Sequence, residues 1–334
     1  MSTVDLHSIR YKAVAALSTG EMLHLDQASE NIAWEENPGE LAVRLNLTLR
    51  DMKTDNGKYL ATRLGLGTQI YLYSIWGGIE HETFRGTIWQ QESSPLNEEQ
   101  IIITGYDRLY YLQKSKDNRY FAKGSRTRTI AEDLLIQHGI TLGRYTGSNI
   151  SHEKLAFKGK TLGSMMEEIL QLADENTKSA KTLIRMRAGQ AEIVRQGENS
   201  TIYGFNIGEN ISDISETYSM VDLVTRVIVT GKEDKETKPP IEATLNGALE
   251  FGLLQEIHTK GDATLEEAKN AAQKILNERG QPKRIITVRA PEFPGIRKGD
   301  RIHINAGRIS GYFYVKGVSH NATTAQMQME VEPT

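Results

Sequence analysis

The sequence predicts a mainly β fold with α+β character, in which a helical α+β module separates two small β modules. Apolar and polar residues alternate with a period of two near both ends of the chain, whereas helical spacing with capping signals marks its middle. Several short strands separated by turn residues indicate a small barrel or sandwich in each β module. We therefore expect domains at residues 1–107, 108–198 and 199–334.

Composition limits the classes of protein to which the chain can belong. With 334 residues and 37.4 kDa, it is long enough for about two or three domains. The 40 Lys and Arg against 43 Asp and Glu give a net charge of −3, so nucleic-acid binding would have to come from a local basic patch. The absence of cysteine excludes thiol catalysis, Cys-ligated zinc, iron–sulfur clusters and disulfides.

The first β module contains the clearest alternation in the chain. From 41 to 50, five apolar residues alternate with polar or small ones, a pattern typical of a half-buried strand. Further strands are expected at 69–76, 84–90 and 100–104.

The middle module carries two predicted helices and a hairpin. Thr129 and Glu132 form the spacing of a capping box, which predicts a helix that stops before Gly139. A second helix is predicted from 161 to 175, because its apolar residues recur at helical spacing. Strands at 182–187 and 191–195 flank a predicted turn.

The second β module begins with a predicted strand at 223–230 and a charged loop at 231–240. Thr264 and Glu267 form another capping box, which predicts a helix over about 264–279, inserted in this module and ended by Gly280. Four more strands are expected at 283–289, 300–305, 311–318 and 324–331.

Familiar catalytic signatures match only in part. Gly159-Lys160-Thr161 lacks the first glycine of a phosphate-binding loop, and none of the eight histidines has another four residues away. We therefore predict no catalytic residue, no metal site, no cofactor and no enzymatic activity. A glycosidase carboxylate pair cannot be recognised from one sequence, so a peptidoglycan-degrading hydrolase stays open as an alternative.

One basic segment is a candidate interface. Six basic residues are interleaved with aromatic ones and a single acidic residue: Lys114, Lys116, Arg119, Lys123, Arg126 and Arg128. Such a run fits either an acidic protein partner or a nucleic-acid backbone, so a nucleic-acid-binding β-barrel protein is a second alternative.

The N-terminus shows no basic segment followed by an apolar one, and no apolar run reaches the ~20 residues that a membrane span needs. We expect a product that is made in the bacterial cytoplasm and does not bind a membrane by itself.

Several short motifs, in a fixed order, resemble a known family. They are Gly105-Tyr106-Asp107-Arg108-Leu109, the turn ending in Gly299-Asp300, the strand that starts at Gly311-Tyr312, and Gly317-Val318-Ser319-His320. In this order the sequence is similar to the late control protein D family of contractile phage tails, in its short form from Gram-positive bacteria. The family residues expected to have structural roles are Tyr106, Asp107, Gly299, Asp300, Gly311 and His320.

The resemblance implies a baseplate hub without enzymatic activity. Such hubs are homotrimers whose two barrel-like tube domains per subunit make a pseudo-sixfold ring between the sixfold tail tube and the threefold spike. The implied partners are the tube protein, the spike protein and other baseplate proteins, with DNA only as cargo passing through the lumen. Lys232 and Lys235, in the charged loop, would reach a neighbour in the phage tail or bacteriocin-like particle.

Overall fold

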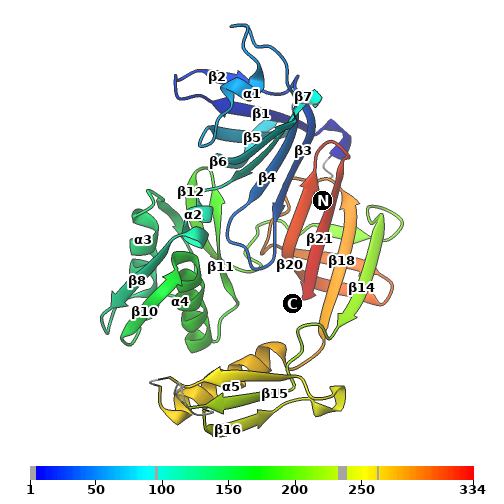
Figure 1. The fold of residues 1–334 in the computed structure, drawn as a ribbon. Helices are drawn as coiled ribbons and strands as arrows, with labels where there is room; N and C mark the ends of the chain where they lie inside the picture. Colours follow the sequence, from blue (N-terminus) through cyan, green and yellow to red (C-terminus); the bar gives the residue numbers. More distant parts are fainter. Residues whose placement is uncertain (1–4, 95–96, 232–238, 262) are drawn as a thin grey trace. The chain divides into compact units, whose positions relative to one another are not determined.

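The computed structural model describes residues 5–94, 97–231, 239–261 and 263–334. The chain forms two compact units, Met1–Ile214 with Thr287–Thr334 and Ser215–Ile286 (Figure 1). The predicted interface residues Lys232 and Lys235 lie outside the described residues. None of the helices in the described part of the chain is both long and apolar enough to cross a membrane.

A 13-stranded sheet organises the larger unit. Its hydrogen-bonded order is β14 (Asp213–Ser219), β18 (Lys283–Pro291), β21 (Gln326–Pro333), β20 (Ile309–Asn321), β3 (Ser29–Glu36), β4 (Arg44–Arg50), β7 (Asn97–Tyr106), β6 (Ile79–Ser94), β5 (Gln69–Trp76), β1 (Arg10–Ala16) and β2 (Met22–His24). Off this path, β19 (Arg301–Ala306) pairs with β20, and β13 (Gly204–Asn206) pairs with β19.

The pairing of β3 with β20 joins the N-terminal and C-terminal β regions in one sheet. In this antiparallel pair Trp34 lies opposite His320, and Glu36 lies opposite Val318. The mainly β fold class is confirmed, and the strand order over the described residues is open, ending at β14 and β2. The domain boundaries at 107 and 198 stay a prediction.

The predicted alternation at 41–50 builds the wall of the N-terminal core. Leu45, Leu47 and Leu49 on β4 are fully buried. The strand starts at Arg44 rather than at residue 41. Leu41 and Val43 are buried as the alternation predicts, but they precede the first residue of the strand. Strand β5 has the predicted bounds, whereas β6 and β7 are longer than expected. A short helix, α1 (Leu60–Arg63), closes this region, and a 3₁₀ turn, Leu6–Ser8, precedes β1.

The middle of the chain forms small sheets packed on helices. In chain order the elements are α2 (Leu109–Lys114), β8 (Lys116–Phe121), α3 (Thr127–Ile136), β9 (Leu142–Tyr145), β10 (Leu155–Thr161), α4 (Leu162–Thr177), β11 (Thr182–Arg187) and β12 (Gln190–Arg195). Strands β8 and β10 pair as a two-stranded ribbon, and β11, β12 and β9 form a three-stranded sheet. The apolar face of α4, including Met165, Met166 and Ile169, is completely buried in this core.

Two of the three local predictions for this region are confirmed. Helix α4 begins after Thr161, whose side chain accepts a hydrogen bond from the Ser164 amide at 3.1 Å. Ala188 (φ 47°) and Gly189 (φ 76°) make the predicted tight hairpin turn. The capping box at Thr129 is wrong: α3 starts two residues earlier, so Thr129 lies inside its first turn.

The smaller unit is a three-stranded sheet with one helix packed on it. Its strands, in sheet order, are β16 (Ile241–Asn246), β15 (Arg226–Thr230) and β17 (Gln255–Thr259), with a 3₁₀ turn at Leu249–Phe251. Helix α5 (Leu265–Arg279) buries Ala268, Ala272 and Leu276 against Val227 and Val229 of β15. The capping box predicted for this helix is confirmed: Thr264 and Glu267 exchange the two expected hydrogen bonds.

Candidate functional site

A buried ion pair links two distant segments of the larger unit. Arg297 lies in the loop between β18 and β19, and Glu36 is the last residue of β3. The Arg297 guanidinium donates to both Glu36 carboxylate oxygens, at 2.8 and 3.0 Å. Its third hydrogen bond, 2.8 Å long, reaches the carbonyl oxygen of Met186 at the end of β11. One side chain therefore ties together the β3 end, the β11 end and the C-terminal loop.

A second ion pair lies beside the first. The Arg185 guanidinium on β11 lies 3.1 Å from the Asp300 carboxylate, which also accepts from the Arg297 amide at 3.0 Å. The ammonium group of Lys298 donates to the carbonyl oxygens of Asn37, at 3.2 Å, and Glu40. These contacts anchor the 297–300 turn to the chain that follows β3.

Asp107 connects β7 to α2 in the same region. It is only 1% exposed, and its carboxylate accepts from the amides of Val43 at 3.0 Å and Leu109 at 2.9 Å. Burial raises the pKa of this carboxyl to about 7, against the lowering effect of the two amides and of Arg297. We call Glu36, Asp107, Arg185, Arg297 and Asp300 the buried charged junction.

The pKa values of the other two acids of the buried charged junction shift in opposite directions, because burial and neighbouring charges act against each other. Burial favours the neutral form of Glu36, but Arg297, Arg185 and Lys298 outweigh it and hold the pKa of Glu36 below its ordinary value. For Asp300 burial is the larger effect, so the pKa of its carboxyl is raised in spite of Arg185. Burial likewise lowers the pKa of Lys298.

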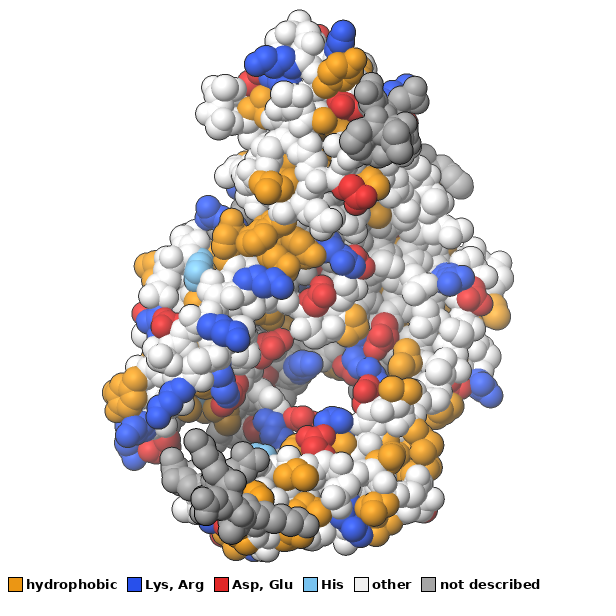
Figure 2. Space-filling view, viewed as in Figure 1, with side chains coloured by type: hydrophobic (Ala, Val, Ile, Leu, Met, Phe, Trp, Pro, Cys, Tyr) orange, Lys and Arg blue, Asp and Glu red, His pale blue; other side chains and the backbone are white. Residues whose placement is uncertain are grey.

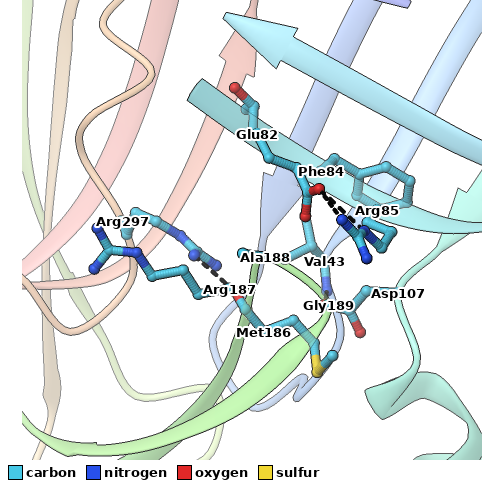
Figure 3. A pocket seen from close by; sticks show the side chains of 11 residues that line it. Val43, Glu82, Phe84, Arg85, Asp107, Met186, Arg187, Ala188, Gly189 and Arg297 are labelled. Atoms are coloured by element: carbon cyan, nitrogen blue, oxygen red, sulfur yellow. Dashed lines mark hydrogen bonds and ion pairs between the residues drawn. The ribbon is translucent and has the colours of Figure 1, made fainter. Parts of the chain in front are cut away.

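A pocket opens beside the buried charged junction (Figure 3). Its lining includes Glu82, Arg85, Asp107, Arg187 and Arg297, and two of these residues, Glu82 and Arg85, form an ion pair. The space inside, about 20 Å³, is enough for about one water molecule. This pocket is therefore suited to solvating the junction rather than to enclosing a substrate.

A second cluster of buried polar side chains lies where β3 pairs with β20. His320, 2% exposed, is 3.0 Å from both carboxylate oxygens of Glu292 and 3.2 Å from the carbonyl oxygen of Ile296. The hydroxyl of Tyr11 also donates to Glu292, at 3.1 Å. The His320 ring stacks on Trp34 with the centroids 4.6 Å apart, as their register positions require.

The other predicted structural residues lie at an aromatic contact, at a turn and within a strand. Tyr106 stacks on Tyr110, with ring centroids 3.8 Å apart. Gly299 has φ 89°, and a Cβ there would overlap the side chain of Leu183. Gly311 has φ 131° within β20, with open space around it. The structural importance assigned to these residues stays a prediction.

The side chains of the predicted basic segment have different surroundings, and the role of the segment as an interface stays a prediction. Three of its six described members face carboxylates: Arg119 lies near Asp117 (2.9 Å) and Asp133 (3.3 Å), Lys123 near Glu153 (3.0 Å), and Arg128 near Glu132 (2.9 Å). Lys114 lies over the ring of Tyr110, with Nζ 5.0 Å from its centroid. Lys116 and Arg126 are exposed.

Sequence reasoning missed Glu36, Arg185 and Glu292, which complete the two buried polar groups. No local pattern marks them, because Glu36 is 261 residues from Arg297 and Glu292 is 28 residues from His320. Over the described ranges, no three His, Asp or Glu side chains are grouped so as to hold a metal ion.

Solved structures of tail proteins share this fold. A 43 kDa tail protein of prophage MuSo2 from Shewanella oneidensis has a TM-score of 0.67 and 13% identity, with 97% of this chain and 98% of that chain covered. A tail protein from Neisseria meningitidis gives 0.64 and 12%, covering 97% and 96%. A prophage tail protein from Listeria monocytogenes gives 0.53 and 10%, covering 96% and 94%. At these identities the likeness shows a common fold.

The sequence itself matches a family model. No curated protein sequence matches the chain significantly. The model of the YQBQ-like family, however, matches residues 32–333, which include β3, the buried charged junction and the last strand of the sheet. This match covers most of the chain, and the chain therefore belongs to the YQBQ-like family.

Proposed function

We propose that this chain is a structural protein of a phage tail or tail-like particle and forms its baseplate hub. The observation that carries the proposal is the fold shared over nearly the whole length of two tail proteins, at TM-scores of 0.67 and 0.64. The motif order that resembles the late control protein D family supports the finer assignment to a hub.

In this role three copies form a ring of six β modules. Each copy contributes residues 1–107 and 199–334, so the ring presents six modules toward the sixfold tube while keeping the threefold symmetry that a trimeric spike needs. The continuous sheet through β3 and β20 supports this role, because it fixes two β regions of one subunit to each other.

The hub role implies several partners: a second and third copy of the chain, the tube protein, the spike protein and other baseplate proteins. The role is one of assembly rather than catalysis. Assembly takes place in the bacterial cytoplasm, and the protein then stays part of the particle.

The test is the mass and shape of the assembled protein. We expect the chain, alone or mixed with the tube protein of its particle, to scatter light as a species of three times 37.4 kDa and to form threefold rings in electron micrographs. Tube protein alone serves as the control. A chain that stays monomeric in both conditions contradicts the hub.

The same preparation decides between the two alternatives. Clearing of a peptidoglycan suspension would favour the hydrolase, and DNA binding that weakens steeply with salt would favour the nucleic-acid binder. Either activity in a chain without ring formation would replace the proposed function.

A further inference from the structure

The two-stranded ribbon β8–β10 carries an exposed basic face. Side chains alternate along β8, so Lys116, Asn118 and Tyr120 point outward while Phe121 packs inward. Ala156 of β10 lies opposite Tyr120, and Lys158, two residues on, is exposed at the bulge where the register of the ribbon shifts. Lys154, just before β10, lies over the Tyr120 ring with Nζ 5.5 Å from its centroid. We call Lys116, Asn118, Tyr120, Lys154, Ala156 and Lys158 the ribbon face.

The ribbon face is supported by packed side chains and carries three lysines without a carboxylate close to them in the described part of the chain. Its inner side packs Phe121 against Phe157, and the amide of Gly159 donates to Asn118 at 2.8 Å across a bulge. Among the described residues, no carboxylate lies within 4 Å of the ammonium groups of its three lysines, and Tyr120 is 61% exposed. Figure 2 shows Lys and Arg side chains over this part of the molecule. The positive charge of this surface is complementary to an acidic partner, and an exposed tyrosine is a side chain enriched in interfaces.

The chain itself contains a region with an excess of the opposite charge. Residues 108–198 contain 16 Lys and Arg against 10 Asp and Glu, whereas residues 1–107 contain eight against 15, of which Glu36 and Asp107 are buried. The excess of one sign in each region favours contact between the basic region of one copy and the acidic region of another. A nucleic acid fits less well, because three lysines reach few phosphates and the acidic region would repel the rest of the strand.

We propose that the ribbon face docks on the acidic region, residues 1–107, of a second copy of this chain. The contact is heterologous, so it propagates from copy to copy and closes into a ring if the rotation between copies allows. The inference rests on the proposed function, because it names the surface through which hub subunits would meet.

The first test reverses the charge of the ribbon face. In the triple variant Lys116→Glu, Lys154→Glu and Lys158→Glu we expect self-association to weaken at least ~10-fold in sedimentation velocity at ~0.05 M salt, where charges are poorly screened. A matched control places the same three changes at exposed lysines outside both the ribbon face and residues 1–107, Lys178→Glu, Lys181→Glu and Lys283→Glu. The control keeps the net charge of the variant, so unchanged association there assigns the loss to the ribbon face. Equal weakening in both variants would overturn the docking surface.

The second test identifies the partner region. A carbodiimide couples a lysine to a carboxylate only when the two are in contact, and a mixture of ¹⁵N-labelled and unlabelled chains separates links between copies from links within one. We expect labelled–unlabelled links between Lys154 or Lys158 and carboxylates of residues 1–107. Links to any other region, or DNA binding lost in the triple variant, would overturn the proposal.

The two tests also separate this inference from the hub. If the triple variant still forms the threefold rings of the wild type, the ribbon face is not the docking surface and the hub stands. If the wild type forms no ring with or without tube protein, the hub itself fails. A wild-type chain that does not self-associate at any salt concentration overturns the docking of a second copy directly.

Discussion

Removal of the Arg297 charge is the most direct test of the buried charged junction. In Arg297→Met the side chain keeps much of its volume, but Glu36, 4% exposed, loses both hydrogen bonds that its carboxylate receives from Arg297. Breaking a buried ion pair from one side costs about 3–5 kcal/mol, because the other charge stays buried without a partner. The carbonyl oxygen of Met186 also loses its donor, which adds about 1 kcal/mol. We expect a total loss of about 4–6 kcal/mol.

The double variant Glu36→Met with Arg297→Met isolates the pair. With both charges gone, no unpaired carboxylate stays buried, and we expect a loss of only about 1–2 kcal/mol from packing and from Met186. The coupling between the two sites is then at least about 2 kcal/mol. Arg289→Met is the control, since Arg289 is more than half exposed and its loss should cost under ~0.5 kcal/mol.

Urea unfolding followed by tryptophan fluorescence measures these differences. All three tryptophans lie in residues 1–107, and Trp34 is two residues before Glu36, so the signal reports on the segment that the pair anchors. The reasoning is refuted if Arg297→Met is as stable as Arg289→Met, or if the single and double variants lose the same stability.

Three further predictions address the buried acid, a turn and the helix caps. The pKa of Asp107 is about 7 in the folded chain against 3.8 ordinarily, so ionisation of its carboxyl destabilises the fold as pH rises through 7. We therefore expect the free energy of unfolding in urea to be higher at about pH 5.5 than at about pH 8. The Asp107→Asn variant should show a smaller dependence of this free energy on pH. Gly299→Ala should lower stability by about 2 kcal/mol, because φ is 89° and the new Cβ meets Leu183; a melting temperature equal to the wild type's would contradict this. Thr264→Ala should cost about 1 kcal/mol in thermal unfolding through the lost cap, whereas Thr129→Ala, inside α3, should cost under ~0.5 kcal/mol, and equal costs would argue against the caps as described.

Local patterns predicted the elements whose stabilising contacts are themselves local. Helix α5 was recognisable because its cap, its apolar stripe and its terminal Gly280 all lie within 17 residues. Strand β5 was recognisable because it is rich in Ile and Tyr and follows a glycine turn. The failure at Thr129 has a simple reason: the Thr-x-x-Glu spacing also occurs inside a helix, and only the backbone shows that α3 had already begun.

Long-range pairings gave no local signal. Strand β3 has the sequence Ser-Glu-Asn-Ile-Ala-Trp-Glu-Glu, which contains three charged residues. This sequence does not indicate that the strand joins two β regions. Its partner in the sheet, β20, lies nearly 300 residues away, and neither strand's pattern specifies the other.

The candidate interface shows the same limit at the surface. The basic segment was defined as a linear run, but Arg119 and Lys123 pair with the more distant Asp133 and Glu153, and Arg128 pairs with Glu132 on its own helix. The lysines that complete the ribbon face, Lys154 and Lys158, are far along the chain and reach it only because β10 pairs with β8. The interface predicted from sequence stays a prediction, and the strand pairing adds Lys154 and Lys158 to the basic residues of this region.

The buried charged junction also affects which arrangement of its segments the chain adopts. Buried ion pairs add little net stability compared with apolar packing, because desolvation offsets most of the attraction. They do penalise every arrangement in which one partner is missing, and Arg297 has three acceptors that lie on two different segments, Glu36 on β3 and Met186 on β11. A shift of either segment would leave Glu36 charged and buried without its donors. The junction is thus better suited to fixing one arrangement of these segments than to raising stability.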